Sequence, residues 1–398
     1  MDEGVMKTYA RADEVFVDGH GAVLRDSTGR EFLDFLAGIA VSALGHGHAE
    51  LAAALRDQVG KVVHLSNLFR HPYTEQVATR LCQLTDMAAA FFTNSGTEAM
   101  ECALKLARKA MYARGTPQRS AFVAIEGGFH GRSLGALSLT YSEKYRKPFQ
   151  PLQPCTWVAP EDIAALAKVL RQQQACALVL EPVQGEGGIR ELSAGFLQQA
   201  RELCTETGTL LVHDEIQSGC GRTGRFLAAQ HAGVIPDVVT LAKPIAAGLP
   251  MGACLTTAAF ADTFAKGEHG STFAGGPLVC RAALVFLDEI ERGLLGNVME
   301  RGAELRHGLE TLQREFPIVR EVRGRGLMFG LRLHHSAEAV QKALYQAGVI
   351  VNCTAGDVLR IVPPFVLTKA QVQEGIARLR SVLARFPAQA PTPTEVKK

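Results

Sequence analysis

The sequence predicts an α/β fold with two parts. The larger is a three-layer domain around a mostly parallel sheet, and a smaller α+β domain follows it. Two features of residues 75 to 290 lead to this prediction. Segments with helical apolar spacing alternate there with strand-like segments, which favours helices on both faces of one sheet. Several strand-like segments are continuous apolar runs, such as "VVTLA" (238–242), and such runs are typical of parallel strands buried on both faces.

The N-terminal segment, residues 1–65, is expected to contain two strands and a helix. Apolar residues alternate in 21–38 around a Ser-Thr-Gly turn, which predicts two strands, and residues 48–65 have helical spacing. In the middle of the chain we expect helices at 74–85, 95–114, 161–173, 194–207 and 276–292. The strands expected there are 121–125, 176–183, 209–216, 238–242 and 252–257.

The pattern changes at about residue 295. The elements expected beyond it are a charged helix (298–315), strands within 319–333, a helix (336–347), strands within 348–352 and 358–364, and a final helix (368–385). We therefore expect a large domain over 66–294 and a small domain over 295–398. The N-terminal segment, 1–65, is expected to belong to the small domain.

Composition excludes several classes of function. The net charge of +2 and the single Trp argue against a nucleic-acid surface. The nine cysteines are odd in number, widely spaced and without a C-x-x-C pair, which indicates reduced thiols rather than disulfides or a metal site. No secretory signal and no apolar run long enough for a membrane is recognised. These features predict a cytoplasmic protein that binds neither metal, membrane nor nucleic acid.

Lys243 is a candidate nucleophile. It follows an apolar strand, precedes the apolar stretch "PIAAGLPMGA", and is the only basic residue between His231 and Lys266. Such a lysine either extends its amine to solvent or is functional. If the amine is desolvated, its pKa falls, and the free amine suits a Schiff base with a carbonyl compound.

Asp214 ends another apolar strand, with Glu215 beside it and Gln217 three residues after it. A carboxylate at the end of a buried strand requires a partner. That partner could be a structural arginine, Arg222 or Arg225, or the protonated ring nitrogen of a cofactor. Gln217 could reach a neighbouring polar atom.

Two Gly-containing stretches suit anions and rings. Ser95-x-x-Glu98 is a capping box, so Ser95, Gly96 and Thr97 either cap a helix or hold a phosphate through their backbone N–H groups. In "GGFHGRS" (127–133), Phe129, His130 and Arg132 follow a strand. There an aromatic face could stack on a planar cofactor, and the arginine could bind a carboxylate. A surface turn is the alternative.

Four further residues are weaker candidates. Glu186 lies on a Gly-rich loop after a buried strand, and Arg360 alternates with apolar residues in a strand. Each is either a solvated charge or part of a substrate site. Ser271 and Thr272 precede an apolar helix, where their hydroxyls either cap the helix or contact phosphate.

Residues 219–224 match the dinucleotide motif G-x-G-x-x-G. That motif requires its first glycine directly after a strand and a helix that begins inside it. Here "DEIQS" intervenes, and no acidic residue follows at the required distance of about 20 residues. A nicotinamide-dependent oxidoreductase is therefore a remote alternative, which a dialysis test of NAD(P) binding would decide.

The joint set of motifs resembles the class III aminotransferases, which depend on pyridoxal 5′-phosphate (PLP) and have the fold-type I architecture. The strings that carry the resemblance include "FLDFLAGIAVSALGHGH", "HLSNLF", "NSGTEAMECALKLAR", "GGFHGRSLGALSLT", "EPVQGEGG", "LLVHDEIQSGCGRTG", "LAKPIAAGLPMGA", "HGSTFAGGPLVCRAAL" and "VLRIVPP". They span residues 32 to 364. Pro244 and the wording "AGGPL" depart from the family pattern, which puts loop geometry and substrate preference in doubt.

The resemblance implies roles around the cofactor ring. Lys243 would form the Schiff base and move the proton, and Asp214 would pair with the ring nitrogen. Gln217 would contact the phenolic oxygen and Phe129 would stack on the ring, with His130 beside it.

The resemblance also assigns the phosphate. Ser95, Gly96 and Thr97 would hold it, and Thr272 would reach it from the partner subunit of a homodimer.

The resemblance further implies a reaction between two amino acids. The expected reaction transfers the terminal amino group of N2-acetyl-L-ornithine to 2-oxoglutarate, giving N-acetylglutamate 5-semialdehyde and glutamate, in arginine biosynthesis. Arg132 would bind the distal carboxylate of the donor, with Ser271 also in the substrate site. Arg360 would bind the α-carboxylate of glutamate, and Glu186 would mask Arg360 when the donor enters.

Two alternatives to this reaction stay open. The donor could be succinylornithine, ornithine, 4-aminobutyrate, succinyl-diaminopimelate or a carrier-bound lysine precursor. The chain could also be a non-catalytic binding protein with this fold, although intact Lys243 and Asp214 argue against that.

Overall fold

The computed structural model describes residues 4–173 and 175–386. Within them, the largest sheet has seven strands in the order β4-β12-β11-β10-β7-β5-β6. The strands are β4 Ala89–Thr93, β5 Phe122–Ile125, β6 Cys155–Val158, β7 Ala177–Leu180, β10 Leu210–Asp214, β11 Val238–Leu241 and β12 Gly252–Thr256. β12 runs antiparallel to β11 and β4, and the other pairs are parallel. The prediction of a mostly parallel sheet is confirmed.

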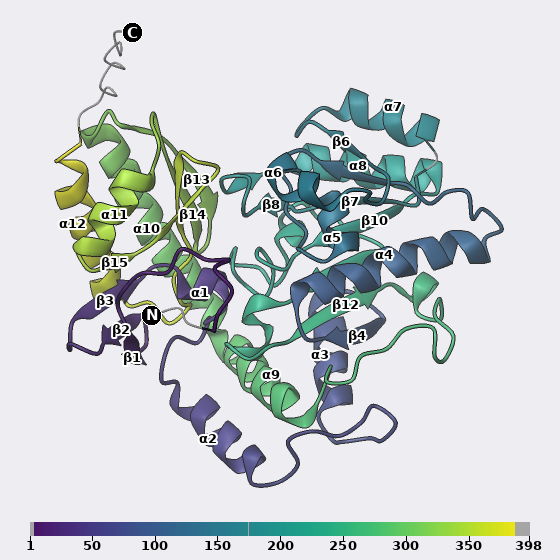
Figure 1. Ribbon diagram of the computed structural model, residues 1–398, viewed down its shortest axis with the longest axis horizontal. Coiled ribbons are helices and arrows are strands. Elements are labelled where there is room, and N and C mark those ends of the chain that lie inside the picture. The colour runs from purple at the N-terminus through teal and green to yellow at the C-terminus, as the bar shows by residue number, and fades with distance from the viewer. Residues whose placement is uncertain (1–3, 174, 387–398) are drawn as a thin grey trace.

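Helices cover both faces of this sheet (Figure 1). They are α3 Thr74–Thr85, α4 Gly96–Ala113, α5 Leu134–Leu139, α6 Glu143–Arg146, α7 Ile163–Gln173, α8 Ala194–Thr207 and α9 Pro277–Glu289, with the shorter η1 Lys147–Phe149, η2 Ala228–His231, η3 Lys243–Ala246, η4 Ala258–Phe260 and η5 Ile290–Leu294. In β7, Ala177 and Val179 pack into the cluster that contains α4, whereas Leu178 and Leu180 pack into the cluster that contains α7 and α8. Both faces of the strand are buried, which explains its continuous apolar sequence.

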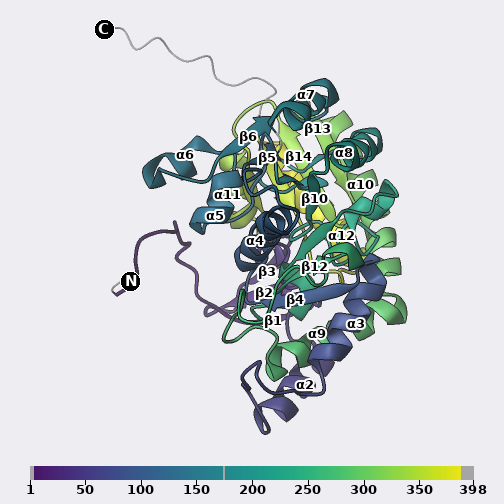
Figure 2. The ribbon, with the colours of Figure 1, turned by 90° about the vertical axis from the view of Figure 1, so that its right-hand side faces the viewer.

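The smaller part contains two four-stranded sheets among the described residues, in the orders β1-β2-β3-β15 and β13-β14-β17-β16. Their strands are β1 Phe16–His20, β2 Val23–Asp26, β3 Glu31–Asp34, β13 Val319–Arg325, β14 Met328–Leu333, β15 Val349–Ile350, β16 Asn352–Thr354 and β17 Val358–Ile361. The helices of this part are α10 Leu295–Glu315, α11 Glu338–Gln346 and α12 Lys369–Leu383, with α1 Ala37–Ala40 and α2 Ala49–Val59 nearer the N-terminus. Parallel pairing of β15 with β3 joins both ends of the chain in one sheet. The chain from Gly4 extends away from this body (Figure 2) and meets it at Glu14, whose Oε2 accepts a hydrogen bond from the Tyr345 hydroxyl at 2.8 Å.

Three details differ from the sequence-based expectations. β4, β6 and α5 were not expected from the sequence. The strand expected over 176–183 ends at Leu180, and Val183–Gln184 (β8) forms a separate hairpin with Arg190–Glu191 (β9). The helix expected over 48–65 ends at Val59, because Gly60 and the β-branched Val62 and Val63 disfavour continuation.

The parallel strands bring their carboxyl ends to one edge of the large sheet, and the loops at such an edge commonly bind ligands. Asp214 is the last residue of β10, and Lys243 follows the neighbouring β11. The sheet therefore brings these two residues to adjacent positions. In the described part of the chain no helix is both long and apolar enough to cross a membrane.

Candidate active site

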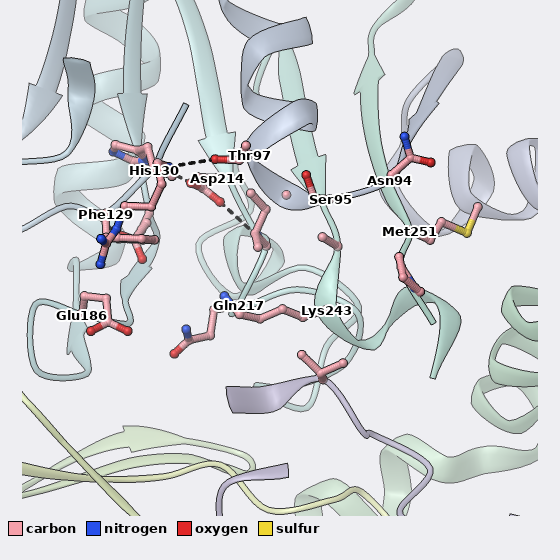
Figure 3. Close-up of a pocket in the computed structure, with 18 of the residues that line it drawn as sticks. Asn94, Ser95, Thr97, Phe129, His130, Glu186, Asp214, Gln217, Lys243 and Met251 are labelled. Carbon is pink, nitrogen blue, oxygen red and sulfur yellow. Dashed lines mark hydrogen bonds and ion pairs between the residues drawn. The ribbon is translucent and has the colours of Figure 1, made fainter. Parts of the chain in front are cut away.

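A cavity of about 480 Å³ opens at this edge of the sheet. Its size is typical of small-molecule sites. Most of the predicted site residues line it: Ser95, Gly96, Thr97, Phe129, His130, Arg132, Glu186, Asp214, Gln217 and Lys243. They come from five separate segments of the chain, and Figure 3 shows those that it labels around a common space.

Lys243 projects into this cavity from the start of η3 (Figure 3). Its φ is +41°, an unusual conformation for a residue with a side chain, and such strain is often found at functional sites. Burial lowers the pKa of Lys243, and the opposing effect of the Asp214 carboxylate does not restore it. A lysine with a lowered pKa is a better nucleophile at neutral pH.

Asp214 is buried, and His130 is its side-chain partner. His130 Nδ1 and Asp214 Oδ2 lie 2.8 Å apart, and the backbone N–H of Ile216 donates to Asp214 Oδ1 at 3.1 Å. Burial acts to lower the pKa of His130, but the hydrogen bond and charge of Asp214 outweigh it, so the pKa is raised overall. The orientation of the Asp214 carboxylate is therefore fixed from two sides.

The suggestion that Arg222 or Arg225 is the partner of Asp214 was wrong. Arg222 Nη1 instead donates to the carbonyl oxygens of Leu327 (3.1 Å) and Pro363, and Arg225 Nη1 donates to the carbonyl of Gln230 at 3.0 Å. These bonds tie the loop after β10 to the smaller part of the chain and to its own turn. The chain bends through Gly219, Gly221 and Gly224 without entering a helix, so residues 219–224 lack the form of a dinucleotide motif.

The first turn of α4 forms another wall of the cavity. The predicted N-cap is present, because Ser95 Oγ accepts a hydrogen bond from the Glu98 N–H at 3.2 Å. Glu98 Oε2 in turn accepts from the Asn94 N–H at 2.8 Å. The N–H groups of Gly96 and Thr97 have no partner within the helix because of their position, and they face a site that favours an anion.

Glycines leave room close to the polar side chains. A Cβ atom on Gly96 would lie 2.8 Å from the Ile216 side chain, and one on Gly185 would lie 2.5 Å from Gln217 Oε1. A Cβ atom on Gly131 would collide with Thr97 Oγ1. The backbone therefore lies close against the cavity wall at these points, as expected for loops that approach a ligand.

Arg360 lies on β17 and is 1% exposed. Its Nη1 is 2.6 Å from Glu186 Oε1 and donates to Gln217 Oε1 at 3.3 Å. Its Nε donates to Asn352 Oδ1 at 3.0 Å. The predicted pairing of Glu186 with Arg360 is therefore present, and Gln217 contacts the same guanidinium.

Ser271 and Thr272 do not line the cavity of their own chain. Ser271 Oγ accepts a hydrogen bond from Asn94 Nδ2 at 3.0 Å, and Thr272 is exposed. Ser271 therefore acts here as a partner of Asn94, which does line the cavity.

Glu181 was not singled out from the sequence as a site residue. It is 6% exposed and accepts from the backbone N–H groups of Phe129 (2.8 Å) and Gly185 (2.9 Å). Burial raises the pKa of Glu181 to about 7. This carboxylate joins the loop that carries Arg132 to the loop that carries Glu186. Its position after an apolar strand was the available signal.

The sequence of this chain matches a known protein family over nearly its whole length. The sequence model of the family described as aminotransferase class-III matches residues 8–383. The chain belongs to the class-III aminotransferases.

Individual class-III aminotransferases resemble this chain throughout. The acetylornithine aminotransferase of Aquifex aeolicus is 43% identical over 382 residues, which are 95% of this chain and 99% of that protein. The N-acetylornithine aminotransferase of Stenotrophomonas maltophilia has a similar structure (TM-score 0.84, 36% identity, 95% and 97% of the two chains). The ornithine aminotransferase of Toxoplasma gondii, whose structure shows partial occupancy of PLP, has a TM-score of 0.91 at 32% identity and covers 96% and 92%.

Proposed function

We propose that this aminotransferase binds PLP through Lys243 and transfers the terminal amino group of N2-acetyl-L-ornithine to 2-oxoglutarate, a step of arginine biosynthesis. The observation that carries the proposal is the juxtaposition of Lys243 and Asp214. They follow adjacent parallel strands and line one cavity, which the N-terminus of α4 closes. The relatives named acetylornithine aminotransferase support the choice of donor.

The donor groups of the cavity fit PLP. The phosphate group suits the N-terminal N–H groups of α4, and the pyridine nitrogen suits the Asp214 carboxylate. Asp214 and the first turn of α4 line the same cavity, so both groups of the cofactor would find a partner there. When bound, PLP supplies a carbonyl that takes up the amino group and a ring that delocalises negative charge.

The residues of the chain divide the remaining work. Lys243, whose pKa burial lowers, would hold the cofactor covalently and then move a proton at the reacting carbon. Asp214, oriented by His130 and by the Ile216 N–H, would place its carboxylate beside the ring nitrogen. Phe129, which lines the cavity, would limit movement of the ring and exclude water from one face.

Two arginines suit the two substrates. Arg132 would bind the α-carboxylate of N2-acetylornithine, far from the amine that reacts. Arg360 would bind the α-carboxylate of glutamate after Glu186 moves away, and Glu186 would cover Arg360 while the donor is bound. The 2.6 Å ion pair between Arg360 and Glu186 supports this order.

We also propose that the protein acts as a cytoplasmic homodimer in which Thr272 and Ser271 serve the partner's site. Leu68 and Phe273 are 88% and 66% exposed, and Asn67 Nδ2 donates to the Ser271 carbonyl at 3.1 Å. The exposed side chains of Leu68 and Phe273 form an apolar edge beside Thr272, and a second copy of the chain would cover this edge. Sedimentation velocity should give the mass of a dimer, and a monomer at micromolar concentration would contradict this assignment.

The proposal is tested by mixing the purified, PLP-loaded protein with N2-acetyl-L-ornithine in the absence of 2-oxoglutarate. The visible band of the lysine-bound cofactor should disappear as the amino group is transferred. Ornithine, succinylornithine and 4-aminobutyrate provide the comparison, and their rates should be lower. A visible band that only ornithine removes would transfer the assignment to that donor. Absence of any visible band would contradict the role of Lys243.

A further inference from the structure

Arg132 is held in an unusual way for a residue that binds a carboxylate. Its guanidinium carbon lies 3.9 Å from the centre of the Tyr145 ring and 5.5 Å from the centre of the Phe129 ring. The two rings are edge-to-face, with centres 6.4 Å apart. The guanidinium therefore packs against two aromatic side chains rather than against a carboxylate.

We propose that Tyr145 is a positioning residue for the amino donor: its ring, with that of Phe129, holds the Arg132 guanidinium so that its N–H edge meets the donor's carboxylate. This inference rests on the proposed role of Arg132 and extends it. Tyr145 does not line the cavity, and it comes from the short helix α6, outside the family strings that identify the site.

Hydrogen bonds fix the backbone of residues 129–132 independently of the two aromatic rings. The N–H of Phe129 donates to Glu181, the N–H of His130 donates to Thr140 Oγ1 at 3.0 Å, and the N–H of Arg132 donates to Thr97 Oγ1 at 3.0 Å. The remaining freedom of Arg132 lies in its long side chain. The two rings restrict that freedom.

α6 is also attached to the body of the large sheet. The guanidinium carbon of Arg146, next to Tyr145, lies 4.0 Å from the centre of the Trp157 ring on β6, and Arg146 Nη2 donates to the Tyr141 carbonyl at 3.1 Å. Tyr145 is thus presented to Arg132 from an anchored turn. Tyr145 therefore lies on an anchored turn rather than on a loose surface loop.

Contact through the face of the guanidinium matters because its donors lie in its plane. A ring on that face attracts the cation without using an N–H group, so the donors stay available for a two-point bond to a carboxylate. The clamp therefore favours ω-amino donors that end in a carboxylate over amines that lack one.

The test compares two donors that differ only in this group. N-acetylputrescine is N2-acetyl-L-ornithine without its carboxylate. In the holoenzyme, Tyr145→Leu should lower kcat/KM for N2-acetyl-L-ornithine roughly tenfold through KM, and it should leave N-acetylputrescine and 2-oxoglutarate unchanged. Tyr145→Phe retains the ring and should restore the kinetics. Tyr112→Leu is the matched control, because Tyr112 is exposed on α4 and its ring lies beside Lys109 rather than Arg132.

A binding measurement removes the chemistry from the test. N2-acetyl-L-norvaline retains the carboxylate and the acetamide but has no terminal amine. Calorimetric titration of the holoenzyme should give a dissociation constant roughly tenfold weaker in Tyr145→Leu than in the wild type or in Tyr145→Phe.

Arg132→Met separates failure of this inference from failure of the proposed function. If Arg132→Met lowers kcat/KM for N2-acetyl-L-ornithine but Tyr145→Leu does not, the positioning role of Tyr145 is overturned, and the role of Arg132 in binding the donor is retained. If Tyr145→Leu weakens both donors equally, its role is only structural and the inference is overturned. If Arg132→Met has no effect on either donor, the donor site is misassigned and the clamp falls with it.

Discussion

Arg132 lines the cavity, Arg360 bonds to two residues that line it, Glu186 and Gln217, and the surroundings of the two arginines differ. Arg132 is exposed, and its guanidinium packs over the Tyr145 ring, with the guanidinium carbon 3.9 Å from the centre of that ring and 5.5 Å from the centre of the Phe129 ring. Arg360 is 1% exposed, and oxygen atoms of Glu186, Gln217 and Asn352 accept from its edge. Among the described residues, the Arg132 guanidinium thus has aromatic neighbours and no hydrogen-bond partner, whereas Nε and Nη1 of Arg360 both donate to oxygen atoms.

The difference teaches how one site can take two carboxylates. A face-held arginine accepts a substrate without losing a contact, so it is ready at all times. An edge-held arginine must exchange a partner, and the partner here is a carboxylate on a Gly-rich loop. Under the proposed function, the first arrangement suits the donor, and the second suits glutamate, which must displace Glu186.

The largest expected effect comes from removing the Lys243 amine, which both half-reactions would require. Lys243→Ala should lower transamination by roughly 10⁴-fold or more, because the covalent hold on the cofactor and the proton transfer are both lost. The visible band of the lysine-bound cofactor should be missing from the purified variant. Retained turnover would contradict the assignment of Lys243 as the residue that holds the cofactor and transfers the proton.

Arg360→Ala removes the edge-held member of the pair. The half-reaction with glutamate should slow by roughly 10² to 10³-fold, since a substrate carboxylate loses a buried charged partner. The half-reaction with N2-acetyl-L-ornithine should change far less. Single-turnover spectra of each half-reaction provide the measurement, and a larger loss for the donor would reverse the assignment.

Glu186→Gln should weaken the mask without removing the arginine. Because the ion pair is reduced to a neutral hydrogen bond, KM for glutamate should fall by about three- to tenfold. The ratio of kcat/KM for N2-acetyl-L-ornithine to that for glutamate should fall accordingly. Steady-state kinetics with both amino donors checks this. A rise in KM for glutamate would mean that Glu186 assists glutamate binding instead of masking Arg360.

The smallest effect concerns stability, and it extends the comparison to two buried histidines. His130 has a carboxylate partner, whereas neither ring nitrogen of His213 has a partner among the described residues. Burial lowers the pKa of His213 from 6.5 to about 3. Between these values the unfolded chain binds a proton that the folded chain does not, so His213 reduces stability as the pH falls below 6.5.

His213→Leu should remove this penalty. On going from pH 8 to pH 5, the variant should lose about 2 kcal/mol less unfolding free energy than the wild type. Urea unfolding at the two pH values checks the difference. Parallel losses in both proteins would show that His213 stays protonated or finds a partner in the folded state.

Much of this site could be predicted because its residues end strands. Asp214 and Lys243 follow apolar runs, and parallel strands bring their carboxyl ends together. The contact of His130 with Asp214 could not be predicted, because it joins residues 84 positions apart through side-chain orientation. Tyr145 carried no signal either, since α6 is a single turn without apolar periodicity.

The positions of Arg222 and Thr272 teach the same lesson. Arg222 lies eight residues after Asp214, yet it turns to carbonyl groups of the smaller part of the chain instead. The sequence indicates that a buried charge needs a partner, but the path of the loop decides which one. Thr272 is exposed and does not line the cavity of its own chain, and a contact with a second copy cannot be read from one chain.

The most direct test of the account is a crossed comparison of half-reactions. Arg132→Met and Arg360→Ala, each loaded with PLP, are mixed in single turnovers with N2-acetyl-L-ornithine and, separately, with glutamate. The account predicts opposite patterns: Arg132→Met loses mainly the N2-acetyl-L-ornithine half-reaction, and Arg360→Ala loses mainly the glutamate half-reaction. Equal losses of both half-reactions in each variant would contradict the division of labour between the two arginines.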